Sequence, residues 1–147
     1  NAAINRPDTV SAAGYFALMQ HGDECIGSPV YFFFDLNAAR LTDSLQKVNL
    51  DALAHVAKKY GLSVKVTGAA DSATGTASIN NALSTARADY IAGELIKRGL
   101  SAESITRTYE GGISYYVPNE ANRHTKVELY FREVVFLFIS ENNFFIF

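Results

Sequence analysis

The chain has 147 residues, of which 48% are apolar and 19% are charged, a balance typical of one globular domain with short appendages. Its 13 basic and 15 acidic side chains give a net charge of −2, which excludes the strongly basic surface of most nucleic-acid-binding proteins. The single cysteine, Cys25, excludes an internal disulfide and a zinc site with several cysteines. No apolar run is long enough to predict a membrane-spanning helix.

Residues 1–28 carry the weakest pattern and are predicted to form an N-terminal extension. Asp8 precedes apolar residues at helical spacing, but Gly14 disfavours a helix there. The turn-rich segment HGDECIGSP at 21–29 separates this extension from the first predicted strand, at 30–34. Because that strand is a continuous apolar run, we expect it to be buried on both faces.

A helix is predicted next, with Thr42 or Asp43 as its N-cap and Gly61 as its stop signal. Lys58 and Lys59 lie in its last turn, where positive charge complements the helix dipole. Apolar residues recur at spacings of three and four, so we expect one buried face formed by Leu45, Val48, Ala52, Leu53, Val56, Ala57 and Tyr60.

The rest of the pattern predicts a second helix and three further strands. The helix is predicted at 78–98, and its buried face is expected to contain Leu83, Ala88, Ile91 and Leu95. Strands are predicted at 62–68, 104–109 and 126–131, with loops at 69–76 and 110–124. The order is therefore β-α-β-α-β-β, and each helix needs an apolar partner for its buried face. We predict an α/β (α+β) two-layer sandwich, with two helices on one face of a mixed four-stranded sheet.

The last stretch, 133–147, is predicted to be an apolar C-terminal tail. Residues 134–139 are almost wholly apolar and β-prone, so the tail would promote aggregation if it were exposed. We favour a strand that pairs at the sheet edge or packs on the N-terminal extension, which supplies Phe16, Leu18 and Met19. The alternative is self-association of the chain through this tail.

The residue pattern contains no signature of catalysis. His21, His55 and His124 have no metal-ligand spacing, and the motifs HExxH, CxxC and GxSxG and a Gly-rich phosphate loop are absent. Paired carboxylates suited to acid–base chemistry are not evident either. We therefore predict no enzymatic activity, no metal ion and no cofactor, although His124 could contact an anion beside Arg123.

Asp71 and Arg87 are the pair that indicates a ligand. Asp71 follows the strand predicted at 62–68, and Arg87 lies two to three turns into the helix that packs back over that strand. A carboxylate and a guanidinium that share one cleft suit a zwitterion, because one takes an ammonium and the other a carboxylate. The alternative is that Asp71 only caps a turn and that Arg87 is a solvated helix charge.

These residues belong to a longer pattern that resembles the OmpA C-terminal-like domain family, a periplasmic peptidoglycan-binding module of Gram-negative outer-membrane proteins. The resemblance covers residues 30–131. It rests on the segments YFFFDLNAARL, VTGAAD and NRHTKVEL and on the series Gly75, Asn80, Leu83, Ser84, Arg87 and Ala88. It implies that residues 29–132 form the peptidoglycan-binding domain, between the extension at 1–28 and the tail.

The resemblance also implies roles for individual residues. Asp71 and Arg87 occupy the positions that hold diaminopimelate of the peptidoglycan stem peptide, and Asn80 matches a residue that orders the loop. Phe34 and Asp35 match the strand end that lines the cleft, and Arg123 matches the first arginine of the final Asn-Arg-Arg-Val segment. The implied function is noncovalent anchoring of an outer-membrane component to the cell wall, in the periplasm.

The chain departs from the family pattern near the expected site. Ala69 and Ala70 stand where the family has His-Thr or Tyr-Thr, one residue is inserted between Asp71 and Gly75, and the final arginine pair becomes RHTK at 123–126. One wall of the pocket is therefore expected to be less polar. Two other functions remain open: a protein-interaction module that binds no ligand, and an enzyme acting on wall peptides.

Overall fold

The computed structural model describes the backbone of residues 14–140 and 143–146, and the side chains of residues 25–132. The helices are α1 (Ser44–Lys59) and α2 (Ala77–Lys97), with short 3-10 helices at Ala102–Ser104 and Asn119–Asn122. The strands are β1 (Gly14–Cys25), β2 (Val30–Phe33), β3 (Ser63–Asp71), β4 (Ile105–Ile113), β5 (His124–Ser140) and β6 (Asn143–Ile146). No helix of the described residues combines the length and apolar character needed to cross a membrane.

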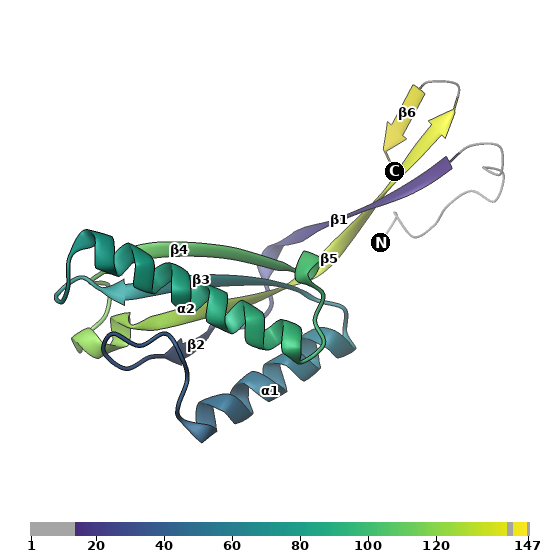
Figure 1. Cartoon of the computed structure of the whole chain (residues 1–147). Helices are drawn as coiled ribbons and strands as arrows, with labels where there is room; N and C mark the ends of the chain where they lie inside the picture. Colours follow the sequence, from purple (N-terminus) through teal and green to yellow (C-terminus); the bar gives the residue numbers. More distant parts are fainter. Residues whose placement is uncertain (1–13, 141–142, 147) are drawn as a thin grey trace.

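The body of the molecule is a mixed sheet in the order β2-β5-β3-β4, with both helices on one face (Figure 1). β5 pairs antiparallel with β2 and β3, and β3 pairs parallel with β4. Phe32, Val64, Val66 and Val127 face the helices and form one core cluster with the buried residues of α1 and α2. The predicted two-layer α/β sandwich is therefore confirmed.

Helix α1 begins where the sequence indicates but buries a different face. The Asp43 side chain caps it, because its carboxylate accepts a hydrogen bond from the Leu45 amide at 2.8 Å. The buried residues are Leu50, Leu53, Ala54 and Ala57, whereas Leu45 is 72% exposed. The prediction that Leu45, Val48, Ala52, Val56 and Tyr60 face inward is wrong. Two apolar stripes run along this helix, and the stripe with Leu50, Leu53, Ala54 and Ala57 is the one that packs into the core.

Helix α2 crosses β3 at very short distance. A Cβ atom on Gly68 would clash with the backbone carbonyl of Ser84, so glycine is required at this crossing. The predicted burial of Ala88, Ile91 and Leu95 is confirmed, while Leu83 is only half-buried. Asn80, Ser84 and Arg87 are also buried, which places polar side chains of α2 against the C-terminal end of β3.

Three strands are longer than the sequence predicts. β3 continues to Asp71 and β4 to Ile113, because Ala70 and Asp71 pair with Gly112 and Ile113. The loops predicted at 69–76 and 110–124 are therefore shorter than expected. β5 begins at His124 and continues to Ser140. The small residues and glycines in these segments favour turns locally, but sheet pairing overrides that preference.

The N-terminal segment and the C-terminal tail pair with each other. β1 runs antiparallel to β5, from Gly14 opposite Ile139 to Cys25 opposite Tyr130. β6 pairs with the end of β5 on its other edge. Figure 1 shows this ribbon extending beyond the two helices. A strand thus occupies the part of the extension that starts at Gly14, and the helix start expected at Asp8 lies outside the described residues.

Candidate functional site

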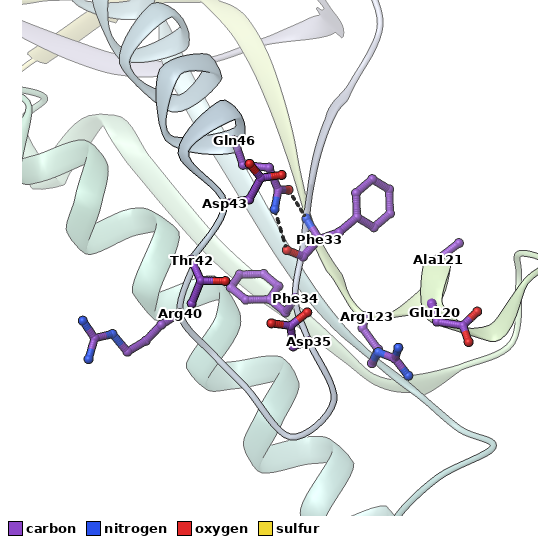
Figure 2. A pocket seen from close by; sticks show the side chains of 10 residues that line it. All are labelled: Phe33, Phe34, Asp35, Arg40, Thr42, Asp43, Gln46, Glu120, Ala121 and Arg123. Carbon is purple, nitrogen blue, oxygen red and sulfur yellow. Dashed lines mark hydrogen bonds between the residues drawn. The ribbon is translucent and has the colours of Figure 1, made fainter.

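A cleft of about 460 Å³ opens where the end of β2, the N-terminus of α1 and the segment before β5 meet. Its wall mixes aromatic, acidic and basic side chains, as Figure 2 shows. Among them, Phe34, Asp35 and Arg123 are predicted site residues. The full set is Phe33, Phe34, Asp35, Arg40, Thr42, Asp43, Gln46, Glu120, Ala121 and Arg123.

Hydrogen bonds between the walls hold the cleft in shape. Gln46 accepts from the Phe33 amide at 2.6 Å and donates to the Phe33 carbonyl at 3.0 Å, which fastens α1 to β2 (dashed in Figure 2). The Phe34 amide donates to the Arg123 carbonyl at 2.8 Å, which fastens the end of β2 to the start of β5. The cleft is therefore formed before any ligand arrives.

Arg87 lies behind the cleft and is 0% exposed. Its guanidinium donates to three backbone carbonyls, those of Ala38 at 2.8 Å, Ala69 at 3.0 Å and Asp35 at 3.3 Å. It also lies 5.4 Å from the ring centroid of Phe34. Burial lowers the pKa of Arg87 to about 10, so the side chain stays charged at neutral pH. The interpretation of Arg87 as a solvated helix charge is wrong.

Asp71 has one satisfied and one unsatisfied carboxylate oxygen. Oδ1 accepts a hydrogen bond from the Ala73 amide at 2.9 Å, which closes the turn after β3. Oδ2 is buried and has no hydrogen-bond partner among the described residues, and its closest cation is Arg123 Nη1 at 3.9 Å. The whole residue is 3% exposed. The turn role therefore occupies only half of this carboxylate.

Two more polar atoms are unpartnered in the same region. Within residues 25–132, Arg123 Nε and Thr125 Oγ1 are buried without a hydrogen-bond partner. The positive charge of Arg123 lowers the pKa of Arg87, and the negative charge of Asp71 raises it, so the three side chains share one electrostatic environment. Buried unpaired polar atoms each destabilise a fold by about 1–3 kcal/mol, so these three atoms are the costly part of this region.

Asn80 supports the site from the other side of the turn after β3. Its Nδ2 donates to the Thr74 carbonyl at 3.0 Å, and its Oδ1 lies next to Gly75. Asn80 is buried but does not line the cleft. It therefore ties the loop at 72–76 to the first turn of α2, so it positions Asp71 without facing a ligand.

The structure separates the six predicted residues into three groups. Phe34, Asp35 and Arg123 line the cleft. Asp71 and Arg87 do not line it, but each contacts a residue that does, because Arg87 bonds the Asp35 carbonyl and Asp71 faces Arg123. Asn80 lies farther back. We expected Asp71 and Arg87 to open directly on the cleft, but both side chains are buried and neither lines it, whereas Arg123, 3.9 Å from Asp71, does.

The sequence analysis missed Arg40, Thr42, Gln46 and Glu120 as cleft residues. Arg40 belongs to the YFFFDLNAARL segment and Glu120 lies three residues before Arg123, so both were near a recognised motif. Gln46 carries no sequence signal, since its role depends on an exposed strand edge that only the fold reveals. Within the described residues, no three His, Cys, Asp or Glu side chains converge as a metal site requires.

Comparisons with known proteins give a family match and a curated relative. A model of the OmpA family matches residues 33–126. Outer membrane protein 40 of Porphyromonas gingivalis is 39% identical over 92 residues, which cover 62% of this chain and 24% of that protein. The chain thus spans about a quarter of the length of this curated relative.

Solved structures share the fold at lower identity. The OmpA-like domain of FopA1 from Francisella tularensis has a TM-score of 0.61 and 16% identity, with 82% of this chain and 83% of that chain covered. The peptidoglycan-associated lipoprotein of Burkholderia pseudomallei has a TM-score of 0.57 and 19% identity, with 70% and 89% covered. The family model spans well over half of the chain and includes every residue of the cleft, so the chain belongs to the OmpA family.

Proposed function

We propose that this domain binds peptidoglycan noncovalently through diaminopimelate of the stem peptide, and that it holds an outer-membrane component to the cell wall in the periplasm. Membership of the OmpA family supports the class of ligand, as do the names of an outer membrane protein and a peptidoglycan-associated lipoprotein among its relatives. The single observation that carries the proposal is the unpartnered, buried Asp71 Oδ2 beside Arg123 and Arg87.

The charges match the free head group of diaminopimelate, which carries an ammonium and a carboxylate on one carbon. Asp71 Oδ2 accepts the ammonium, because an ionised acceptor without a partner gives a strong charge-assisted bond. The carboxylate lies against the guanidinium of Arg123, whose Nε is unpaired, and the fixed positive charge of Arg87 adds to the attraction. Phe34 and Asp35 form the adjoining wall.

Access to Asp71 requires a small movement of Arg123. The Arg123 side chain is 16% exposed, whereas that of Asp71 is 2% exposed, so Arg123 separates Asp71 from the cleft. Their 3.9 Å separation is too long for a hydrogen bond, so a change of the Arg123 rotamer breaks no strong contact. Side-chain rotamer changes of this kind are common when ligands bind preformed sites.

Calorimetry with two stem tripeptides tests the proposal. One tripeptide ends in meso-diaminopimelate, and the other ends in lysine, which keeps the terminal ammonium but lacks the carboxylate beside it. We expect the diaminopimelate peptide to bind at least tenfold tighter, and Asp71→Asn to weaken it by about 10- to 100-fold. The exposed Asp89 of α2, which pairs with Arg107 of β4, supplies the matched control Asp89→Asn. Equal affinity for the two peptides would contradict diaminopimelate recognition.

A second candidate, a protein-interaction module, is supported by the exposed stripe on α1. Leu45, Val48 and Val56 are exposed, and an apolar groove of about 310 Å³ runs beside them between α1, Val30 and Leu129. If this were the main function, Leu45→Ser with Val48→Ser would abolish anchoring while Asp71→Asn would leave it intact. The peptidoglycan proposal expects the opposite result.

A further inference from the structure

A cluster of aromatic rings lies beside the cleft, on the sheet face opposite the helices. Tyr31 and Phe33 flank the buried Phe32 on β2, so they point away from the core. The Tyr31 ring is 6.3 Å from that of Phe33 and nearly parallel to it, and 6.0 Å from the Tyr116 ring, which meets it edge-on. We call Tyr31, Phe33 and Tyr116 the aromatic platform. Phe33 is 44% and Tyr116 is 40% exposed.

His124 forms the floor of the aromatic platform. Its ring is 5.0 Å from Tyr31, 5.7 Å from Tyr116 and 6.1 Å from Phe33, and the residue is 2% exposed. Its Nδ1 lies 2.7 Å from the Ala121 carbonyl, to which it donates. Burial lowers the pKa of His124, so the floor is uncharged at neutral pH. His124 is therefore a buried, uncharged residue bonded to the Ala121 carbonyl.

Hydrogen bonds from Asn122, from Gln46 and between two hydroxyls fix the rings in place. Asn122 is 0% exposed, and it accepts from the Tyr116 amide and donates to the Tyr116 carbonyl, both at 3.0 Å. Gln46 holds both backbone groups of Phe33. The Tyr31 and Tyr116 hydroxyls bond each other at 3.0 Å, which raises the pKa of Tyr31 to about 12 and keeps it neutral. The aromatic platform is thus held in place, is uncharged, carries two hydroxyl groups, and combines two nearly parallel rings, Tyr31 and Phe33, with the nearly perpendicular ring of Tyr116.

The aromatic platform is continuous with the candidate site. A second hollow of about 100 Å³ is lined by Tyr31, Phe33, Tyr116 and Ala121. Phe33 and Ala121 also line the larger cleft, so the two cavities share a wall. In Figure 2 the Phe33 ring points away from Gln46 and toward the Ala121 side of the cleft. A ligand seated in the cleft therefore passes over the platform if it continues in this direction.

We propose that the aromatic platform is a saccharide subsite, which takes a pyranose ring of the glycan strand while the attached stem peptide occupies the cleft. This inference rests on the proposed function. A pyranose ring offers an apolar C–H face to aromatic rings, and its hydroxyls can bond those of Tyr31 and Tyr116. Only two amino acids and a lactyl group join the glycan to diaminopimelate, and a linker this short requires adjoining cavities, such as the two that share Phe33 and Ala121.

The chemistry of the platform favours a sugar over other occupants. Its rings and its histidine floor are uncharged, which suits a neutral ring. A purely aliphatic partner would offer no hydrogen bonds to the hydroxyl groups of Tyr31 and Tyr116. Because one covalent ligand would fill both cavities, the second contact adds affinity without the full entropy loss of a separate association.

Three soluble ligands test this inference: the diaminopimelate tripeptide, the same tripeptide carrying its disaccharide, and glycan strands stripped of peptide. We expect the disaccharide to raise the affinity of the tripeptide about fivefold, and the stripped strands to bind weakly but measurably. Tyr116→Ala should remove both effects and leave the tripeptide affinity unchanged. Tyr31→Phe, which keeps the ring and removes one hydroxyl, is expected to remove part of the affinity that the disaccharide adds. Tyr60→Ala, at the far end of α1, is the control.

The outcomes separate this inference from the proposed function. The saccharide subsite is refuted if the disaccharide does not raise the affinity of the tripeptide and stripped strands do not bind. It is also refuted if Tyr60→Ala lowers glycan affinity as much as Tyr116→Ala does. Both results refute it even when the tripeptide binds. If the tripeptide fails to bind while stripped strands bind and depend on Tyr116, the subsite stands and diaminopimelate recognition falls. A Tyr116→Ala variant that dimerises less than the wild type, with unchanged glycan binding, would assign the platform to a second copy of the chain instead.

Discussion

The two halves of α2 bury the same face of one helix but contain opposite kinds of residue. The half near the cleft buries Asn80, Ser84 and Arg87, and the distant half buries Ile91, Ala92 and Leu95. The apolar half stabilises the fold by removing hydrocarbon from water. The polar half holds the turn after β3 and the backbone around Asp35. A buried polar stretch within an otherwise apolar face therefore marks the part of the fold that shapes the site.

The largest effect should come from removing Arg87. Arg87→Met leaves the carbonyls of Ala38, Ala69 and Asp35 without their donor in a buried region, so we expect the free energy of unfolding to fall by about 3 kcal/mol or more. Urea denaturation measures this change. Arg107→Met, which removes an exposed ion pair with Asp89, should change stability by less than about 1 kcal/mol. Similar losses in the two variants would show that Arg87 does not hold the polar half together.

The apolar half is tested by Leu95→Ala. Leu95 is fully buried, so the cavity left behind should lower the free energy of unfolding by about 2–4 kcal/mol. Because this half does not reach the cleft, the affinity of the folded variant for the stem tripeptide should remain that of the wild type. Calorimetry at a temperature where the variant is folded measures this affinity. A tenfold loss would show that the apolar half of α2 also shapes the site, which contradicts the contrast between the two halves.

A smaller, pH-dependent effect should come from His124, on the strand that faces the polar half. Its pKa is lowered by burial, with smaller effects from Lys126 and Arg87 in the same direction and from Ala121 and Glu110 in the opposite one. The unfolded chain therefore binds a proton that the folded chain does not, and stability falls as the pH drops below about 6.5, by at most ~1.4 kcal/mol per pH unit. His124→Gln should reduce the drop in melting temperature between pH 7 and pH 5. His55→Gln, on the exposed face of α1, should leave that drop unchanged.

The smallest effect is expected on the exposed stripe of α1. Leu45→Ser should change the free energy of unfolding by less than about 0.5 kcal/mol, because Leu45 is largely solvated. Leu50→Ala, on the buried face of the same helix, should cost about 2–4 kcal/mol. Parallel urea titrations compare the two. Equal losses would show that the stripe is covered after all, as the sequence pattern predicts.

The sequence predicts the architecture well because helix caps, stop signals and strand alternation are local features. Asp43 and Gly61 bound α1 as expected, and the strands of the body appear in the predicted order. The buried face of α1 was mispredicted because two apolar stripes compete on it, and only packing against the sheet decides between them. Strand ends at Asp71 and Ile113 were missed because their pairing joins residues far apart in the chain.

The candidate site was predictable to the extent that it depends on motifs. Asp71, Arg87, Asn80 and Arg123 belong to the family pattern, but the sequence does not reveal that Arg87 donates to three backbone carbonyls or that Arg123 lies beside Asp71. The spacing of four residues from Leu83 and from Ile91 places Arg87 on the inward face of α2, but its charge favours a surface position, so the pattern does not decide whether it is buried. The aromatic platform has no local signal, because β2 supplies Tyr31 and Phe33 and a loop more than eighty residues later supplies Tyr116.

Co-sedimentation with purified diaminopimelate-type sacculi tests the central claim most directly. The wild type, Asp71→Asn and Asp89→Asn are compared, since asparagine keeps the Oδ1 acceptor for the Ala73 amide, removes the charge beside Arg123 and replaces the Oδ2 acceptor with an NH2 donor. We expect the wild type and Asp89→Asn to sediment with the wall and folded Asp71→Asn to remain in the supernatant. Retention of Asp71→Asn at the wild-type level would contradict the account.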